Sequence, residues 1–200
     1  LRFAEENLSL PSLGIVDVAL FRRHVEVAKN RELFAMEFSR GIPQTKLENV
    51  GAAPNRRGTA VTFHPDPEIF GSLQLKPARL FAMARSKAYL FSGVEIRWKC
   101  APELISDDTP CEAVFQFPGG LADHLREQIG TRDCATAEFF SGAQDFAEGQ
   151  GRVEWAIGWP LWSEGSYSWY CNTIPTPDGG THEAGLRTAI VKGIRAFGAL

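Results

Sequence analysis

The sequence has little that would suit a domain stabilised by disulfides or by a metal. It contains four cysteines among 200 residues, and none of them forms a C-x-x-C pair or has a zinc-binding spacing to a histidine. The residues concerned are Cys100, Cys111, Cys134 and Cys171, together with His24, His64, His124 and His182. We therefore expect free thiols, no structural zinc and a cytoplasmic location.

Long apolar runs and an excess of positive charge are also missing. No apolar run reaches the roughly 18 residues that a membrane-spanning helix needs, and no signal peptide is recognisable. The net charge is −3, whereas a surface that binds nucleic acid over most of its area is basic. We expect no membrane partner, and any contact with nucleic acid must be local.

The composition is that of a globular protein, with 44% hydrophobic and 22% charged residues. Alternating and helical periodicities predict the main elements. They are a hairpin with strands at 25–27 and 33–38, strands at 58–63, 94–100, 114–117 and 153–159, and helices at 77–90 and 121–129. Residues 49–57 are predicted to be a polar loop. Strands that alternate with helices indicate an α+β or α/β fold.

A change of composition predicts a domain boundary near residue 129. Residues 130–151 hold Gly, Ala, Asp and Phe without a sustained period, so we assign residues 1–129 to one domain and 130–200 to a second. The first 24 residues have the least clear pattern of secondary structure in the sequence. Because the chain begins without a methionine and ends within a helical pattern, we expect it to be a fragment.

The stretch from Tyr170 to Leu186 predicts a strand, a rigid turn and a helix. Tyr167, Trp169 and Cys171 alternate with polar neighbours, and the prolines at 175 and 177 are expected to end the strand. The sequence Asp178-Gly179-Gly180 permits a sharp turn through positive φ. Thr181 is then the expected N-cap of the helix, with Glu183 in its first turn.

The last helix has two chemically different faces. At about 100° per residue its apolar and basic side chains separate onto opposite sides. The apolar side chains are those of Leu186, Ile190, Ile194 and Phe197, and the basic ones are those of Arg187, Lys192 and Arg195.

Two motifs resemble a known family. The run N-T-I-P-T at 172–176, followed by D-G-G-T-H-E-A-G-L at 178–186, is similar to a signature of the B subunits of bacterial type IIA DNA topoisomerases. Within that family, the residues of this motif are closer to those of the topoisomerase IV branch than to those of the gyrase branch. Arg56-Arg57-Gly58-Thr59, followed by H-P-D-P-E-I-F at 64–70, is a second match. The resemblance covers about residues 25–200.

The resemblance implies a fold and a function. The fold would be the C-terminal part of a GHKL ATPase sandwich, followed by the start of a transducer similar to ribosomal protein S5 domain 2. The intact protein would use ATP and Mg²⁺ for DNA strand passage, decatenation and relaxation during chromosome segregation. Its partners would be the A subunit of topoisomerase IV, double-stranded DNA, and a second copy that dimerises through the ATPase region in an A2B2 assembly.

The resemblance also implies site residues. Gly58 and Thr59 would lie in the adenine pocket, and the five residues Asp178, Gly179, Gly180, Thr181 and His182 would form a turn of the transducer. His182 is expected to make structural hydrogen bonds, with a role in signalling between the nucleotide and DNA gates as the alternative. The basic face of the last helix is either simply solvated or lines a cavity that holds DNA.

Several motifs that ATP hydrolysis needs in this family are not recognisable. They are the general-base glutamate, the Mg²⁺-binding asparagine, the adenine-reading aspartate and the glycine-rich lid. Glu5-Glu6-Asn7 has the right residue types in the wrong arrangement, and the transducer lysine would lie beyond Leu200. We therefore expect no catalytic residue, no metal ligand and no ATPase activity in this chain alone.

Three other interpretations compete with these. His64, Asp66 and Glu68 could be taken for metal ligands, but the prolines between them fix a turn instead. A gyrase B subunit, with negative supercoiling as its output, is the near alternative to the topoisomerase IV branch. A stand-alone, S5-like nucleic-acid-binding module is the alternative from another class, which the net charge disfavours.

Overall fold

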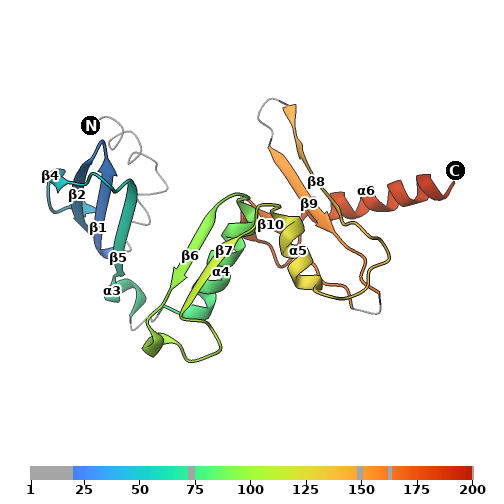
Figure 1. The fold of residues 1–200 in the computed structure, drawn as a ribbon, viewed down its shortest axis with the longest axis horizontal. Coiled ribbons are helices and arrows are strands. Elements are labelled where there is room, and N and C mark those ends of the chain that lie inside the picture. Colours follow the sequence, from blue (N-terminus) through green and yellow to red (C-terminus); the bar gives the residue numbers. More distant parts are fainter. Residues whose placement is uncertain (1–19, 72–74, 148–150, 162–163, 200) are drawn as a thin grey trace. The chain divides into compact units, whose positions relative to one another are not determined.

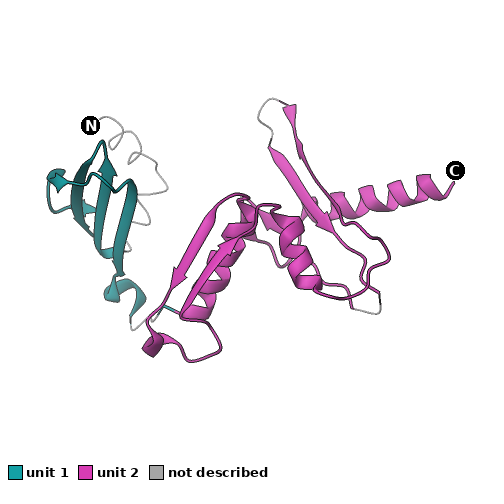
Figure 2. Ribbon diagram, viewed as in Figure 1, with its two compact units in different colours: residues 1–75 teal, residues 76–200 magenta. Residues whose placement is uncertain are grey.

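The computed structural model describes residues 20–71, 75–147, 151–161 and 164–199. The chain divides into two compact units, residues 1–75 and 76–200 (Figure 2). The predicted domain boundary near residue 129 lies inside the second unit and stays a prediction. Within the described ranges, no helix has the length and apolar character needed to cross a membrane.

The first unit is an antiparallel sheet followed by a short helix (Figure 1). Its elements are β1 (Leu20–Lys29), β2 (Glu32–Ser39), β3 (Ile42–Pro43), β4 (Glu48–Ala52), β5 (Gly58–Pro65) and α3 (Pro67–Phe70). The sheet order is β3-β2-β1-β5, and β4 also pairs with β2. Asn30 and Arg31, with φ of 55° and 65°, make the tight turn of the predicted hairpin.

The prediction of a polar loop at 49–57 is wrong for its first residues, which belong to β4. Every residue of β4 is exposed, so the strand has no apolar alternation that a sequence pattern could detect. Its pairing with β2, which joins Ala35 to Glu48 and Glu32 to Ala52, decides its conformation instead.

One face of this sheet is apolar. Val25 pairs with Val61 on one side and with Met36 on the other, and residues two positions away share that face. We call it the apolar sheet face, formed by Val25, Val27, Phe34, Met36, Phe38, Thr59, Val61 and Phe63. Arg23 lies on the same face between Phe38 and Phe63, is 7% exposed, and has its guanidinium 4.3 Å from the Phe38 ring centroid. Phe38 is 8% exposed, whereas Val61 and Phe63 on β5 are 55% and 51% exposed.

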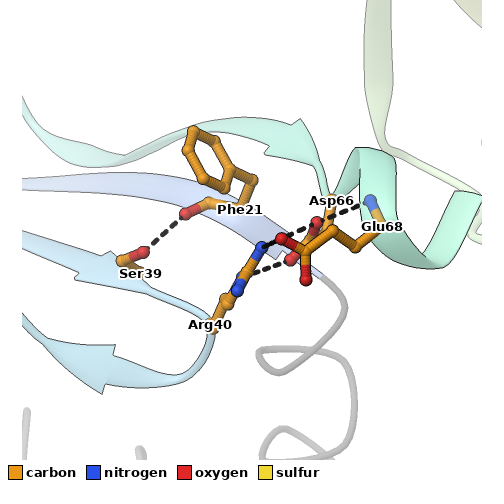
Figure 3. A network of polar contacts seen from close by, with 5 residues as sticks. All are labelled: Phe21, Ser39, Arg40, Asp66 and Glu68. Carbon is orange, nitrogen blue, oxygen red and sulfur yellow. Dashed lines mark hydrogen bonds and ion pairs between the residues drawn. The ribbon is translucent and has the colours of Figure 1, made fainter. Parts of the chain in front are cut away.

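A charged network closes the end of β5 (Figure 3). Asp66 is buried and caps α3 by accepting a hydrogen bond of 2.9 Å from the Glu68 amide. Arg40 donates to Asp66 at 2.5 Å and pairs with the Glu68 carboxylate at 2.7 Å. The amide of Glu68 and the Arg40 guanidinium hold the pKa of Asp66 below its usual value. As expected, the segment after β5 forms an ordered turn at the end of the strand, and the Asp66 side chain takes part in its hydrogen bonds.

In its described residues, the second unit contains the remaining helices and three two-stranded antiparallel sheets. Its elements are α4 (Pro77–Leu90), β6 (Glu95–Lys99), a 3₁₀ turn (Pro102–Leu104), β7 (Glu112–Gln116), α5 (Leu121–Ile129), β8 (Phe140–Asp145), β9 (Arg152–Ile157), β10 (Tyr170–Cys171), β11 (Ile174–Pro175) and α6 (Thr181–Gly198). The helices α4 and α5 have the predicted bounds. Strand β8 falls in the segment that shows no period and was not predicted.

The core of the second unit lies between α4 and the β6–β7 hairpin (Figure 1). Its buried residues are Ala88, Tyr89, Phe115 and Phe117. Aromatic rings meet edge to face here, with the Phe81 centroid 5.0 Å from that of Phe115 and the Tyr89 centroid 5.9 Å from that of Phe117. This geometry is the favourable one for aromatic pairs.

Candidate functional site

Gly58 and Thr59 form the beginning of β5, opposite Ala28 and Val27 of β1. Gly58 has a φ of 114°, a conformation that favours glycine. Thr59 is exposed and lies on the apolar sheet face, next but one to Val61. A hydroxyl therefore stands at the edge of an exposed apolar surface, where it could bind one polar atom of a flat, apolar ligand.

A hollow of about 670 Å³ lies at the other end of β5. Its lining includes Thr62, Phe63 and His64 of β5 and Phe21 to His24 of β1. Thr59 is not among the lining residues, and it is four residues from Phe63, about 13 Å along a strand. The structure thus does not bring Gly58 and Thr59 to this hollow. Among the described residues, no group of three His, Cys, Asp or Glu side chains is placed to hold a metal ion.

The turn before α6 has the predicted order of elements but different bounds. Only Tyr170 and Cys171 form the first strand, and Pro175 belongs to β11, where it pairs with Tyr170. The prediction that the strand runs from Tyr167 and ends at the proline is therefore wrong. Asn172 and Thr173, with φ of 48° and 66°, make a two-residue turn between the strands.

Gly179 and Gly180 have φ of 76° and 152°, as predicted for a sharp turn. The Gly179 amide donates to the Thr176 carbonyl at 2.9 Å, and α6 then begins at Thr181. The N-cap position is occupied by Gly180 without a side-chain hydrogen bond, so the prediction of Thr181 as N-cap is wrong by one residue. Asp178 is exposed at the tip of the turn.

His182 lies half-buried in the first turn of α6. Its Nε2 is 3.1 Å from the Thr176 hydroxyl, and its ring meets the Trp169 ring edge to face, with centroids 6.1 Å apart. These contacts are those of a residue that fixes the turn against the helix. A role of His182 in signalling stays a prediction.

The three basic residues of α6 differ in their surroundings. Arg187 donates to Glu183 at 2.7 Å, and its guanidinium lies 5.5 Å from the Tyr167 ring centroid. Lys192 and Arg195 are exposed further along the helix. Arg187 therefore has partners within its own unit, although its side chain is still 57% exposed, and Lys192 and Arg195 are exposed as well.

Sequence reasoning missed a polar cluster that joins α4 to the β10–β11 hairpin. Lys87 donates to both oxygens of Thr173, and the Tyr89 hydroxyl contacts that of Tyr170 at 2.5 Å. Burial, reinforced by the Tyr170 hydroxyl, raises the pKa of Tyr89. The partners are separated by more than 80 residues, so no local spacing in the sequence could have identified them.

The family model described as DNA gyrase B matches residues 120–199. The B subunit of DNA topoisomerase 4 from Bartonella bacilliformis is 46% identical, over 94% of this chain and 28% of its own length. The corresponding B subunit from Caulobacter vibrioides is 44% identical, over 98% of this chain and 29% of its own length. The chain thus spans less than a third of these relatives.

Solved structures also resemble this chain. The 43K ATPase domain of Thermus thermophilus gyrase B, in complex with an aminocoumarin, has a TM-score of 0.71 and 31% identity, covering 88% of this chain and 46% of that one. The topoisomerase IV ATP-binding domain of Francisella tularensis has a TM-score of 0.68 and 23% identity, covering 92% of this chain and 48% of that one. The second likeness concerns the fold alone.

Proposed function

Since this chain is a relative of the B subunits of bacterial type II DNA topoisomerases, we propose that it forms the back of the ATP-binding domain and the first part of the transducer in such a protein. The predicted fold class is confirmed, because the chain is mixed α and β and its structural neighbours are ATP-binding domains of these subunits. The division of the two parts near residue 129 belongs to the proposal.

The observation that carries the proposal is the apolar sheet face at the start of β5. Thr59 and Val61 stand next but one on this face, and Val61 is 55% exposed. An adenine ring could lie against Val61 while the Thr59 hydroxyl binds a ring nitrogen, directly or through a water molecule. The sites for ATP and Mg²⁺ would be completed by residues of the intact subunit outside this segment, which itself supplies no catalytic group.

In the intact subunit, nucleotide binding would drive dimerisation and the capture of a DNA duplex. A second protein, corresponding to the A subunit of topoisomerase IV, would cut and reseal the other duplex. The relatives are named as B subunits of DNA topoisomerase 4, which supports a topoisomerase with more than one kind of subunit. Decatenation and relaxation of DNA in the bacterial cytoplasm belong to the proposal.

The nucleotide role of Thr59 is tested in the intact subunit by Thr59→Val. Loss of one hydrogen bond with retention of shape should weaken ATP binding about five-fold, measured by titration with a fluorescent ATP analogue. Thr62→Val is the matched control, because Thr62 lies on the same strand but on the opposite face. Equal affinities of the Thr59→Val variant and the wild type would refute the assignment.

The choice between the two branches of the family needs the assembled enzyme. Decatenation of linked circles by the subunit with its A partner, without negative supercoiling of relaxed plasmid, would support topoisomerase IV. ATP-dependent negative supercoiling would instead support gyrase, which the matching family model and the Thermus structure name.

A further inference from the structure

Lys87 is held between the end of α4 and the turn of the β10–β11 hairpin. Its ammonium group donates to the Thr173 carbonyl at 2.8 Å and to the Thr173 hydroxyl at 2.6 Å. The site lies in the last turn of α4, where the helix dipole also favours a positive charge. A single lysine thus connects two segments that are 86 residues apart.

The residue that Lys87 holds has a strained backbone. Thr173 has a φ of 66°, and a β-branched residue rarely adopts this left-handed conformation. Such a conformation persists where neighbouring contacts impose it. Both oxygens of Thr173 bind the same ammonium group, so Lys87 supplies a contact that fixes the turn.

Tyr89 provides a second contact between α4 and the hairpin. Its hydroxyl meets that of Tyr170 at 2.5 Å, and its ring is stacked on His124 of α5 with centroids 3.8 Å apart. Tyr89 is 5% exposed. The contact is therefore made by a residue of the unit's hydrophobic core, and it packs α4 against β10.

From the hairpin, contacts continue to the beginning of α6. The Thr176 amide donates to the Trp169 carbonyl at 2.8 Å, and the Thr176 hydroxyl lies 3.1 Å from His182 Nε2. A displacement of the hairpin against α4 would thus be transmitted to the first turn of α6. Lys87 and Tyr89 lie at the start of this series of contacts.

We propose that Lys87 and Tyr89 are positioning residues, which fix the β10–β11 hairpin on α4 and thereby couple the ATP-binding domain to α6 of the transducer. The proposal rests on the proposed function, since α4 would belong to the first domain and the hairpin to the second. Lys87 and Thr173 make the polar contact between α4 and the hairpin that a substitution can remove. Tyr89 and Tyr170 make the second, more buried contact between them.

The test uses the intact subunit with its A partner and compares Lys87→Met with the wild type. Methionine keeps most of the apolar stem but removes the ammonium group. Basal ATP turnover should stay within about two-fold of the wild type, while stimulation of turnover by DNA should fall about five-fold, as expected for the loss of a charge-assisted hydrogen bond. Thr173→Val, which leaves the carbonyl in place, should give a smaller loss in the same direction.

Two further variants sharpen the result. Combining Lys87→Met with Thr173→Val should add nothing to the first change, since both remove one interaction. Lys99→Met is the control, because Lys99 is a surface residue with an 82% exposed side chain. Hydrogen exchange of the amides from Cys171 to Thr176 should become faster in Lys87→Met but not in Lys99→Met.

The possible outcomes separate the two claims. Unchanged DNA stimulation in Lys87→Met, or a parallel fall of basal and stimulated turnover with the melting temperature, would overturn the positioning role and leave the proposed function intact. A wild-type subunit that hydrolyses no ATP would overturn the proposed function, and the coupling role with it.

Discussion

His124 is a half-buried imidazole whose surroundings disfavour a charge. Its ring is stacked on Tyr89, and its Nδ1 is buried without a hydrogen-bond partner in the part of the chain that the structure describes. Burial lowers the pKa of His124, the Arg85 guanidinium lowers it further, and Glu127 opposes this change. The neutral form is therefore the one that suits the folded state.

The sign of the resulting pH dependence follows from linkage. The unfolded chain, in which the pKa of histidine is about 6.5, binds a proton that the folded unit binds less readily. The contribution of His124 to the free energy of unfolding should therefore be constant above that pH and fall as the pH drops through it. In the variant His124→Phe, which can keep the stacking, this fall should be smaller.

Tryptophan fluorescence measures this effect in the second unit specifically. All five tryptophans of the sequence lie between residues 98 and 169. Thermal unfolding at about pH 7.5 and about pH 5.5, on either side of the histidine pKa, should show a larger loss of melting temperature for the wild type than for His124→Phe. His64→Gln, at an exposed position of the other unit, controls for the removal of a histidine. Identical losses in all three proteins would contradict the prediction.

At the scale of the element, two glycines of the α6 region should respond oppositely to alanine. Gly179 has a φ of 76°, and an added Cβ would meet the Glu183 carboxylate. Alanine there should destabilise the unit by about 1–2 kcal/mol. Gly185 lies inside α6 with no atom within 4 Å of an added Cβ, so alanine should stabilise by about 0.5–1 kcal/mol.

Urea unfolding followed by tryptophan fluorescence compares the two variants. The midpoint should move down for Gly179→Ala and up for Gly185→Ala, with unchanged slopes. Destabilisation by both substitutions would show that close packing, rather than backbone conformation, decides the effect at these positions.

The elements that the sequence predicted well are those with local signals at their ends. Pro77 begins α4, and Gly130 follows the last residue of α5, so both helices could be placed to the residue. Strands β4 and β8 are exposed throughout, and their conformation depends on pairing with β2 and β9. Such pairing has no signature within the strand itself.

The same distinction applies to the candidate site. The turn at Gly179 and Gly180 could be predicted, because positive φ is a property of the residues themselves. The contact of Lys87 with Thr173 could not, because it depends on the packing of segments far apart in the sequence. The cap of α6 was misplaced by one residue, since Gly180 provides the turn and the N-cap position together.

At the scale of the whole molecule, the net charge of −3 means that DNA can be attracted only by a local group of cations. In α6 the predicted candidates are Arg187, Lys192 and Arg195, and of these Arg187 is paired with Glu183. Each phosphate neutralised by such a cation contributes about 0.9 to the slope of log affinity against log salt.

We therefore expect Lys192→Gln combined with Arg195→Gln, in the intact subunit with its A partner, to reduce the salt dependence of DNA-stimulated ATP turnover by about two in that slope if both contact phosphate. Arg187→Gln should leave the slope unchanged and instead lower the stability of α6, since its partners are Glu183 and two aromatic rings. The measurement is a titration of DNA at several salt concentrations. A slope equal to that of the wild type in the double variant would mean that this face of α6 is only solvated, whereas a reduced slope in Arg187→Gln would mean that the internal ion pair opens when DNA binds.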